Sequence, residues 1–194
     1  QTLGIVGYGA IGRELARMAD HLGMKVLAIK RDVMHPEDFD GYAEPGTGDQ
    51  PGDIPTRIYP PEAIASMASE CDFLVLTVPL TVKTTHMVGE DVLKAMKKTA
   101  VLINVARGPV VDEDALISAL AANRLAGAAL DVFEEEPLPT TSPLWNLDNV
   151  IISPHVAGNT VNYHERAAAL FTANLERYLE KQSLLNRFTR QHGY

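Results

Sequence analysis

Short apolar runs rich in β-branched residues recur along the chain. They contain few polar positions, which is typical of strands that are covered on both faces of a sheet. The runs lie at Leu3–Val6, Val26–Ile29, Phe73–Val78, Val101–Val105, Ala128–Val132 and Val150–Ile152. We predict that they form the parallel strands of one sheet.

Stretches with helical spacing separate these runs. The first predicts a helix with one apolar face and one polar face. The apolar face would be formed by Ile11, Leu15, Ala19 and Leu22, and the polar face by Arg13, Arg17 and Asp20. Further helices are expected at Glu90–Met96, at Asp112–Asn123 with Asp112 as N-cap, and at Glu165–Glu180. The alternation predicts a Rossmann-type α/β fold, in which a doubly wound parallel sheet carries helices on both faces.

Composition and charge narrow the possible partners. The 194 residues are 46% hydrophobic and carry a formal net charge of -8, which fits one globular domain whose field repels polyanions. We therefore expect no nucleic-acid partner. Cys71 is the single cysteine, and neither a signal peptide nor an apolar run of membrane-spanning length is evident. We expect a cytoplasmic protein without a membrane partner, and a Cys71 that is a small buried side chain before a strand.

The stretch Gly7–Gly12 reads Gly-Tyr-Gly-Ala-Ile-Gly between a predicted strand and a predicted helix. In that context Gly7 permits a sharp turn, Gly9 admits a pyrophosphate close to the backbone, and Gly12 lets helix and strand pack closely. The N–H groups at the start of the helix would then face the phosphates. The turn predicts a dinucleotide-binding site that involves Gly7, Gly9, Ala10, Ile11 and Gly12.

The end of the second strand bears on the choice of cofactor. An acidic residue there usually binds the ribose 2′-hydroxyl of NAD, but this chain has Lys30 and Arg31, which can pair with the 2′-phosphate of NADP. NADP is therefore slightly favoured. NAD stays open, because both side chains can point into solvent and Asp32 can replace the missing acid after a small shift.

Proline, glycine and acidic residues crowd the stretch Asp32–Pro55. A long surface loop is the simplest interpretation. Because this stretch follows the expected adenosine site, a role as a flap over the cofactor is the alternative.

Reactive side chains follow three of the later strands. They occur in Asn104–Gly108 (Asn-Val-Ala-Arg-Gly), Leu130–Pro137 (Leu-Asp-Val-Phe-Glu-Glu-Glu-Pro) and Ser153–Gly158 (Ser-Pro-His-Val-Ala-Gly). Doubly wound sheets bind ligands at this carboxyl edge. With the glycine-rich turn, Val78–Thr81 and Asn174–Leu179, these segments closely resemble the D-isomer-specific 2-hydroxyacid dehydrogenases, a family that includes D-3-phosphoglycerate and D-lactate dehydrogenases and glyoxylate/hydroxypyruvate reductases. The resemblance runs from Leu3 to about Asn186.

The resemblance implies a set of site residues. Arg107 corresponds to the family's substrate arginine, His155 to its acid/base histidine and Glu136 to the carboxylate partner of that histidine. Asp131 corresponds to the residue that binds the nicotinamide carboxamide. Further positions that contact the cofactor would be Pro79, Thr84, Val105, Ala106, Arg107, His155 and Gly158. No metal is implied.

The resemblance also implies a domain organisation and a function. Residues 1–186 would form the NAD(P)-binding domain and 187–194 a C-terminal tail, while the family's separate substrate domain is absent from this chain. The expected activity is hydride transfer between NAD(P)H and a 2-oxo or D-2-hydroxy acid, by an oxidoreductase that acts on CH–OH donors and forms a homodimer. The isolated chain should be nearly inactive. The alternative is a nucleotide-sensing corepressor with the same fold.

Overall fold

The computed structural model describes residues 1–39, 44 and 46–187. These residues form a parallel sheet with the strand order β3-β2-β1-β4-β5-β6-β7. The strands are β1 (Thr2–Val6), β2 (Lys25–Ile29), β3 (Arg57–Tyr59), β4 (Phe73–Leu76), β5 (Val101–Asn104), β6 (Gly127–Leu130) and β7 (Val150–Ile152). The α-helices are α1 (Ala10–His21), α2 (Ile64–Ala68), α3 (Glu90–Ala95), α4 (Glu113–Ala121) and α5 (Tyr163–Leu179), and the 3-10 helices are η1 (Pro61–Ala63), η2 (Gly108–Val110) and η3 (Pro143–Asn146).

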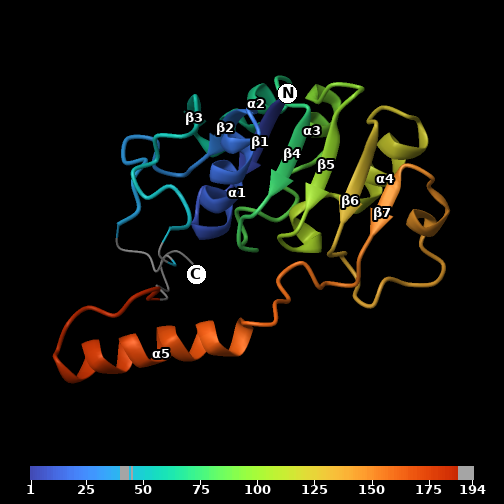
Figure 1. Ribbon diagram of the computed structural model, residues 1–194. Helices are drawn as coiled ribbons and strands as arrows, with labels where there is room; N and C mark the ends of the chain where they lie inside the picture. The colour runs from blue at the N-terminus through green and yellow to red at the C-terminus, as the bar shows by residue number, and fades with distance from the viewer. Residues whose placement is uncertain (40–43, 45, 188–194) are drawn as a thin grey trace.

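Helices cover the two faces of the sheet, as the prediction of a doubly wound fold requires. Figure 1 shows α1 on one face and α2, α3 and α4 on the other. Successive side chains of β4 pack on opposite faces of the sheet. Leu74 and Leu76 belong to the core that contains α2 to α4, and Val75 belongs to the core that contains α1. Strands that are covered in this way have little room for polar side chains, which explains the continuous apolar runs in the sequence. The predicted fold class is confirmed.

The strands end in register at one edge of the sheet. Val6 pairs with Ile29 and with Leu76, and the pairing continues through Leu76 with Asn104, Asn104 with Leu130, and Leu130 with Ile152. The segments that follow these strands therefore gather at a single carboxyl edge. Figure 1 shows that α5 lies beyond this edge, apart from the sheet.

The predicted faces of α1 are confirmed only in part, by the burial of Ala19 and the exposure of Asp20. Ile11 and Leu22, assigned to the apolar face, are 65% and 78% exposed, whereas Arg13, assigned to the polar face, is 3% exposed. Small residues face the sheet instead, because a Cβ on Gly12 would lie 2.2 Å from the carbonyl oxygen of Gly7, and Ala16 is fully buried. Close helix–sheet approach decided the orientation rather than the distribution of large apolar residues.

Several predicted elements need shorter bounds, and some short elements were not predicted. The strands expected to reach Val78, Val105 and Val132 end at Leu76, Asn104 and Leu130, because the chain leaves the sheet there to build the edge. The unpredicted elements are β3, α2 and the 3-10 helices η1, η2 and η3, each too short to show a clear periodic pattern. Asp112 caps α4 as predicted, since its carboxylate accepts a hydrogen bond from Ala115 N–H.

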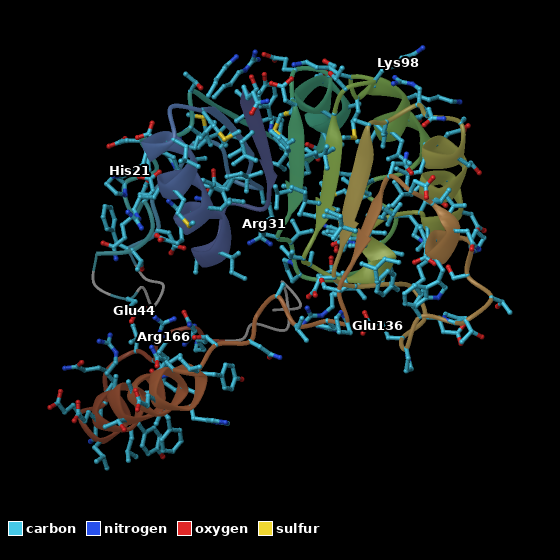
Figure 2. The ribbon with its side chains drawn as sticks, turned by 45° about the vertical axis from the view of Figure 1, so that its right-hand side comes forward. His21, Arg31, Glu44, Lys98, Glu136 and Arg166 are labelled. Atoms are coloured by element: carbon cyan, nitrogen blue, oxygen red, sulfur yellow. The ribbon has the colours of Figure 1, made fainter. Side chains whose placement is uncertain are left out.

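The long α5 helix contributes nothing to the described core. None of its side chains is buried, and Phe171, Tyr178 and Leu179 are exposed. An ion pair joins Arg166 of this helix to Glu44 at 3.0 Å, and Figure 2 shows these side chains facing each other. The conformation of α5 is therefore set by its own helical hydrogen bonds more than by packing.

Three further predictions concern the chain outside the site. Cys71 is fully buried, and its thiol donates to the Met67 carbonyl oxygen at 3.1 Å. Burial raises the pKa of the thiol to about 12. The prediction of a buried structural cysteine is therefore confirmed. In the described part of the chain, no helix has both the length and the apolar character needed to cross a membrane. Residues 188–194 of the predicted tail, and 40–43 and 45 of the predicted loop, lie outside the described residues.

Candidate active site

The glycine-rich turn connects β1 to α1. Gly7 has a φ of +105°, in a region that side-chain-bearing residues rarely adopt, and its N–H donates to the Ile29 carbonyl oxygen at 3.2 Å. A Cβ on Gly7 would lie 2.8 Å from the Val78 side chain, so the turn also packs against the segment after β4. Gly7 and Gly12 are therefore required by the fold itself.

Gly9 differs from the other two glycines of the turn. It is the N-cap of α1, yet a Cβ built on it would meet no atom within 4 Å. Packing within the chain does not demand a glycine here, whereas the close approach of a phosphate to the backbone does. Because the first N–H groups of a helix have no partner inside the helix, the turn fits the pyrophosphate of a dinucleotide.

Arg107 lies in the turn after β5. Asn104 shapes this turn, since its amide donates to the Arg107 carbonyl oxygen at 3.1 Å and accepts from Ala106 N–H at 3.0 Å. The guanidinium of Arg107 donates to the Ala106 carbonyl oxygen at 2.6 Å, and the residue is exposed. A Cβ on Gly108 would fall 1.8 Å from the backbone of Phe133, so only glycine lets this turn approach the segment after β6.

Asp131 follows β6 and is 4% exposed. Its carboxylate accepts hydrogen bonds from the Ser153 hydroxyl at 2.6 Å, from Val156 N–H at 2.9 Å and from Ala157 N–H at 2.8 Å. Burial raises the pKa of Asp131, but these hydrogen bonds outweigh burial, so its pKa lies below the ordinary value. The carboxylate thus stays ionised and holds the segment after β7. Oδ1 accepts two of these bonds, whereas Oδ2 accepts only the bond from Ala157. Oδ2 can therefore accept one more hydrogen bond, as the carboxamide contact predicted from the sequence requires.

His155 and Glu136 form a pair at the carboxyl edge. Nδ1 of His155 lies 2.8 Å from Oε2 of Glu136, and the other carboxylate oxygen accepts from Phe133 N–H at 3.0 Å. Burial raises the pKa of Glu136, but the bonds from His155 and Phe133, with the charge of Arg107, hold it below its ordinary value. The structure therefore brings together Arg107, Glu136 and His155, the three residues predicted to be catalytic.

The backbone of His155 is unusual. Its φ of +55° lies in the left-handed region, which is sparsely populated by residues other than glycine. The conformation is fixed by the buried aspartate, because His155 N–H donates to the Asp131 carbonyl oxygen at 2.8 Å while the Asp131 carboxylate binds the next two N–H groups. The side chain is 47% exposed and reaches Glu136 from this rigid turn.

The remaining predicted contacts of the cofactor occupy the same edge. Thr84 shapes the turn after β4, because its hydroxyl donates to the Pro79 carbonyl oxygen at 2.7 Å and accepts from Thr81 N–H at 2.8 Å. Val105 is half-buried and Ala106 is buried beside the Arg107 turn. A Cβ on Gly158 would meet nothing within 4 Å, as at Gly9.

Lys30 and Arg31 follow β2 but differ in their surroundings. The ammonium group of Lys30 donates to the carbonyl oxygens of His35 and Glu37, and burial lowers its pKa. Arg31 is exposed, and Figure 2 shows it at the same edge of the sheet as Glu136. Lys30 therefore holds the following segment, whereas Arg31 is exposed at the carboxyl edge.

Two features of the edge were not predicted from the sequence. Ser153 lies within the Ser153–Gly158 motif but was assigned no role, although it donates to Asp131. His86 forms a second histidine–carboxylate pair, with its Nε2 2.9 Å from Oε1 of Glu134. The two partners are 48 residues apart, and no local pattern signals such a contact. The described residues contain no group of His, Cys, Asp and Glu suited to a metal ion.

Comparison with known proteins gives the same family from sequence and from structure. Residues 1–157 match the family described as D-isomer specific 2-hydroxyacid dehydrogenase, NAD binding domain. Among curated relatives, the glyoxylate reductase of Korarchaeum cryptofilum is 42% identical over 175 residues, and that of Thermococcus gammatolerans is 44% identical. Each alignment covers 90% of this chain but 48% and 47% of the relative, so the chain spans about half the length of the curated relatives it matches.

Solved structures extend the likeness to the fold. A D-isomer specific 2-hydroxyacid dehydrogenase from Xanthobacter autotrophicus Py2, in complex with NADPH and MES, has a TM-score of 0.84 at 33% identity and covers 100% of this chain and 72% of its own. An NADPH-dependent glyoxylate/hydroxypyruvate reductase from Sinorhizobium meliloti, in complex with NADP and sulfate, has a TM-score of 0.81 at 27% identity, covering 100% of this chain and 57% of its own. The chain therefore belongs to the D-isomer specific 2-hydroxyacid dehydrogenases and forms an NAD-binding domain of that family.

Proposed function

We propose that the polypeptide containing this chain reduces a small 2-oxo acid of the glyoxylate or hydroxypyruvate class, and that this chain binds the nicotinamide dinucleotide and supplies the proton. The carrying observation is the His155–Glu136 pair, which lies at the same sheet edge as Arg107 and the glycine-rich turn. The relatives described as glyoxylate reductases and the Sinorhizobium meliloti glyoxylate/hydroxypyruvate reductase support this substrate class.

Arg107 binds the carboxylate of the substrate. Its guanidinium carries five N–H donors, and the bond to the Ala106 carbonyl oxygen uses one nitrogen. A planar fork can hold a carboxylate through two parallel hydrogen bonds, which orients the 2-oxo group. The Asn104 amide and the absent side chain of Gly108 fix the turn that presents this fork.

His155 is the proton donor. Because Nδ1 faces Glu136, Nε2 is the nitrogen left to face the substrate. When bound, the reduced nicotinamide supplies the hydride to the carbonyl carbon, and His155 gives its proton to the carbonyl oxygen, so that the product is a 2-hydroxy acid. Glu136 orients the ring through its contact with Nδ1, and the lowered pKa of Glu136 keeps its carboxylate ionised for this contact.

The preferred cofactor is NADP. Arg31 pairs with the 2′-phosphate, while Lys30 acts indirectly by holding the backbone of His35 and Glu37. The neighbouring structures with bound NADPH or NADP support this choice. Asp131 would bind the carboxamide through the free capacity of Oδ2, and Pro79, Thr84, Val105, Ala106 and Gly158 would line the remaining cofactor surface.

The domain organisation is part of the proposal. Residues 1–186 form the cofactor domain, and a longer polypeptide supplies a substrate domain, since the alignments cover only 47–48% of the curated relatives. Hydride transfer needs the carbonyl carbon held close to the nicotinamide in a cleft from which water is excluded. The chain alone provides one wall of such a cleft. A homodimer and a cytoplasmic location remain predictions.

Steady-state assays of the longer polypeptide test the proposal. Glyoxylate, hydroxypyruvate, pyruvate and 3-phosphohydroxypyruvate are each offered with NADPH and with NADH, and the first two should give the highest kcat/KM, with NADPH preferred. The 194-residue chain, assayed in parallel, should bind the dinucleotide without appreciable turnover. The absence of any 2-oxo acid turnover, combined with dinucleotide-dependent capture of a partner protein, would instead support the corepressor function.

A further inference from the structure

The segment 46–54 is bound to the start of α1 by a buried polar network. Tyr8, Arg13 and Asp49 are 3%, 3% and 6% exposed. The Tyr8 hydroxyl donates to the Asp49 carboxylate, 41 residues away in sequence, and the Arg13 guanidinium donates to the Asp49 carbonyl oxygen. These contacts favour this arrangement of the segment, because unpaired polar groups are costly at this depth.

Asp49 also organises the backbone of its own segment. Its carboxylate accepts hydrogen bonds from the N–H groups of Gly52, Asp53 and Ile54 at 3.1 to 3.2 Å. With the Tyr8 hydroxyl, the carboxylate therefore has four donors. Burial and the neighbouring Asp49 raise the pKa of Tyr8 well above its ordinary value, which keeps the phenol protonated as a donor.

Arg13 also ties a second stretch, residues 36–38, to the helix. Its guanidinium donates to the Pro36 carbonyl oxygen as well as to Asp49, and its Cζ atom lies 4.6 Å from the centroid of the Tyr8 ring. Asp38 lies 3.8 Å from its Nε. The guanidinium thus lies between the carbonyl oxygens of Pro36 and Asp49 and an aromatic ring, while its Nε has no hydrogen-bond partner among the described residues.

Two residues of the network are chain neighbours of the glycines in the phosphate-binding turn. Tyr8 lies between Gly7 and Gly9, and Arg13 directly follows Gly12. Gly9 itself has no close packing neighbour, because a methyl group at its Cα would meet no atom within 4 Å. Its backbone is held by Arg13, whose N–H donates to the Gly9 carbonyl oxygen at 2.9 Å, and Tyr8 is its chain neighbour, so the contacts of these two residues with Asp49 bear on its position.

We infer that Asp49 is a positioning residue for dinucleotide binding, because it holds the Gly7–Gly12 turn in the conformation that receives the pyrophosphate. The inference rests on the proposed dinucleotide site at this turn. A turn that is held before binding need not be ordered by the ligand, so less of the interaction free energy is lost. The segment 46–54 is then part of the binding site without touching the ligand.

Asp49→Asn in the 194-residue chain tests the inference by calorimetric titration. The variant keeps the size of the side chain but loses one acceptor, so the Kd values of NADH and NADPH should both rise about tenfold, by the same factor. ADP-ribose, which has the pyrophosphate but no nicotinamide, should lose affinity equally. In the longer polypeptide, the KM for the cofactor should rise while kcat at saturation is retained. A general loss of folded protein would instead lower the apparent kcat and leave the KM unchanged.

Glu14→Gln is the matched control. Glu14 contacts the same segment from α1, through Gly48 N–H at 2.7 Å, but it lies outside the turn and the glutamine keeps an accepting oxygen. Its affinity for both dinucleotides should equal that of the wild type. Tyr8→Phe removes one hydroxyl and leaves the backbone contacts of Asp49 intact, so it replaces Asp49→Asn if that variant does not fold, and an increase of about threefold in both Kd values is expected.

The outcomes separate this inference from the proposed function. If the wild-type chain binds neither dinucleotide nor ADP-ribose, the proposed cofactor site is wrong. If the wild type binds and the folded variant Asp49→Asn, or Tyr8→Phe in its place, binds equally well, the site stands and the positioning role of Asp49 is wrong. A loss confined to NADPH would also contradict it, because the pyrophosphate is common to all three ligands.

Discussion

Asp131 follows a strand of the sheet whereas Asp49 lies in a segment without helix or strand, yet the two buried carboxylates are satisfied in the same way. Each accepts one side-chain hydroxyl, from Ser153 or from Tyr8, and the N–H groups of a nearby loop. Each therefore fixes a loop while remaining almost inaccessible itself. His155 takes its position from one of these carboxylates, and we infer that the Gly7–Gly12 turn takes its position from the other.

The difference between the two lies in what they hold. Asp131 places a reactive side chain, because the segment it fixes contains His155. Asp49 places backbone, because the turn it fixes presents N–H groups and a glycine. One end of the edge thus serves the chemical step and the other serves cofactor binding. Substitutions at the first end should lower kcat, whereas substitutions at the second should raise the Kd of the cofactor.

The largest expected effect is at the chemical end. His155→Ala in the longer polypeptide removes the proposed proton donor, so kcat should fall by about 10²- to 10⁴-fold, the usual contribution of general acid catalysis. The Kd for NADPH, measured by calorimetry, should stay within about twofold, because the phosphate-binding turn is untouched. A variant that keeps wild-type turnover, or that loses cofactor affinity instead, would erase the distinction between the two ends.

The next effect concerns stability. Asp131→Asn replaces one accepting oxygen by an amide group that cannot satisfy the loop N–H groups, so the free energy of unfolding in urea should fall by about 2 kcal/mol. Because the pKa of Asp131 is lowered in the folded chain, the difference from wild type should be complete above the ordinary aspartate range. It should vanish as the pH falls through the folded-state pKa. Asp148→Asn, at an exposed position, is the control, with a change below about 0.5 kcal/mol.

A smaller effect should appear in cofactor choice. Arg31→Gln should raise the Kd of NADPH about tenfold and change that of NADH little, since the 2′-phosphate alone distinguishes the two. Lys30→Gln should have a weaker effect, because its ammonium group is occupied by carbonyl oxygens. Lys98, at the opposite edge in Figure 2, offers a control substitution with the same change of charge. Equal losses of NADH and NADPH affinity in Arg31→Gln would remove the reason for preferring NADP.

The smallest effect should be a change in the pH profile. Glu136→Gln removes the ionised carboxylate beside His155 but can still accept a hydrogen bond, so the ring should keep its orientation. The wild type should react about threefold faster than the variant wherever Glu136 is ionised, and this difference should shrink as the pH falls through the pKa of Glu136, which lies below its ordinary value. Rates of reduction measured from about pH 3 to about pH 8, a range that includes the ordinary pKa of glutamate, give the change. Superimposable profiles would contradict the role proposed for Glu136.

The sequence alone determined the sheet and the identity of the residues that gather at its edge. Apolar runs locate six of the strands, and Arg107, Asp131 and His155 were found because each follows a strand end within a few residues. These signals are local. Parallel strands that end in register then bring the residues together with no further information, which is why the His155–Glu136 contact could be predicted from a resemblance carried by short motifs.

Tertiary structure decided what depends on residues far apart in the chain. The burial of Arg13, the acceptors of Lys30 and the network around Asp49 join positions separated by 5 to 41 residues without any periodic pattern. In the sequence, Arg13 is a polar position on a helix and Asp49 is one acidic residue in a loop rich in proline and glycine. A charged side chain becomes buried only when a particular fold supplies its donors and acceptors, and those partners exist only once the segment 46–54 has packed against α1.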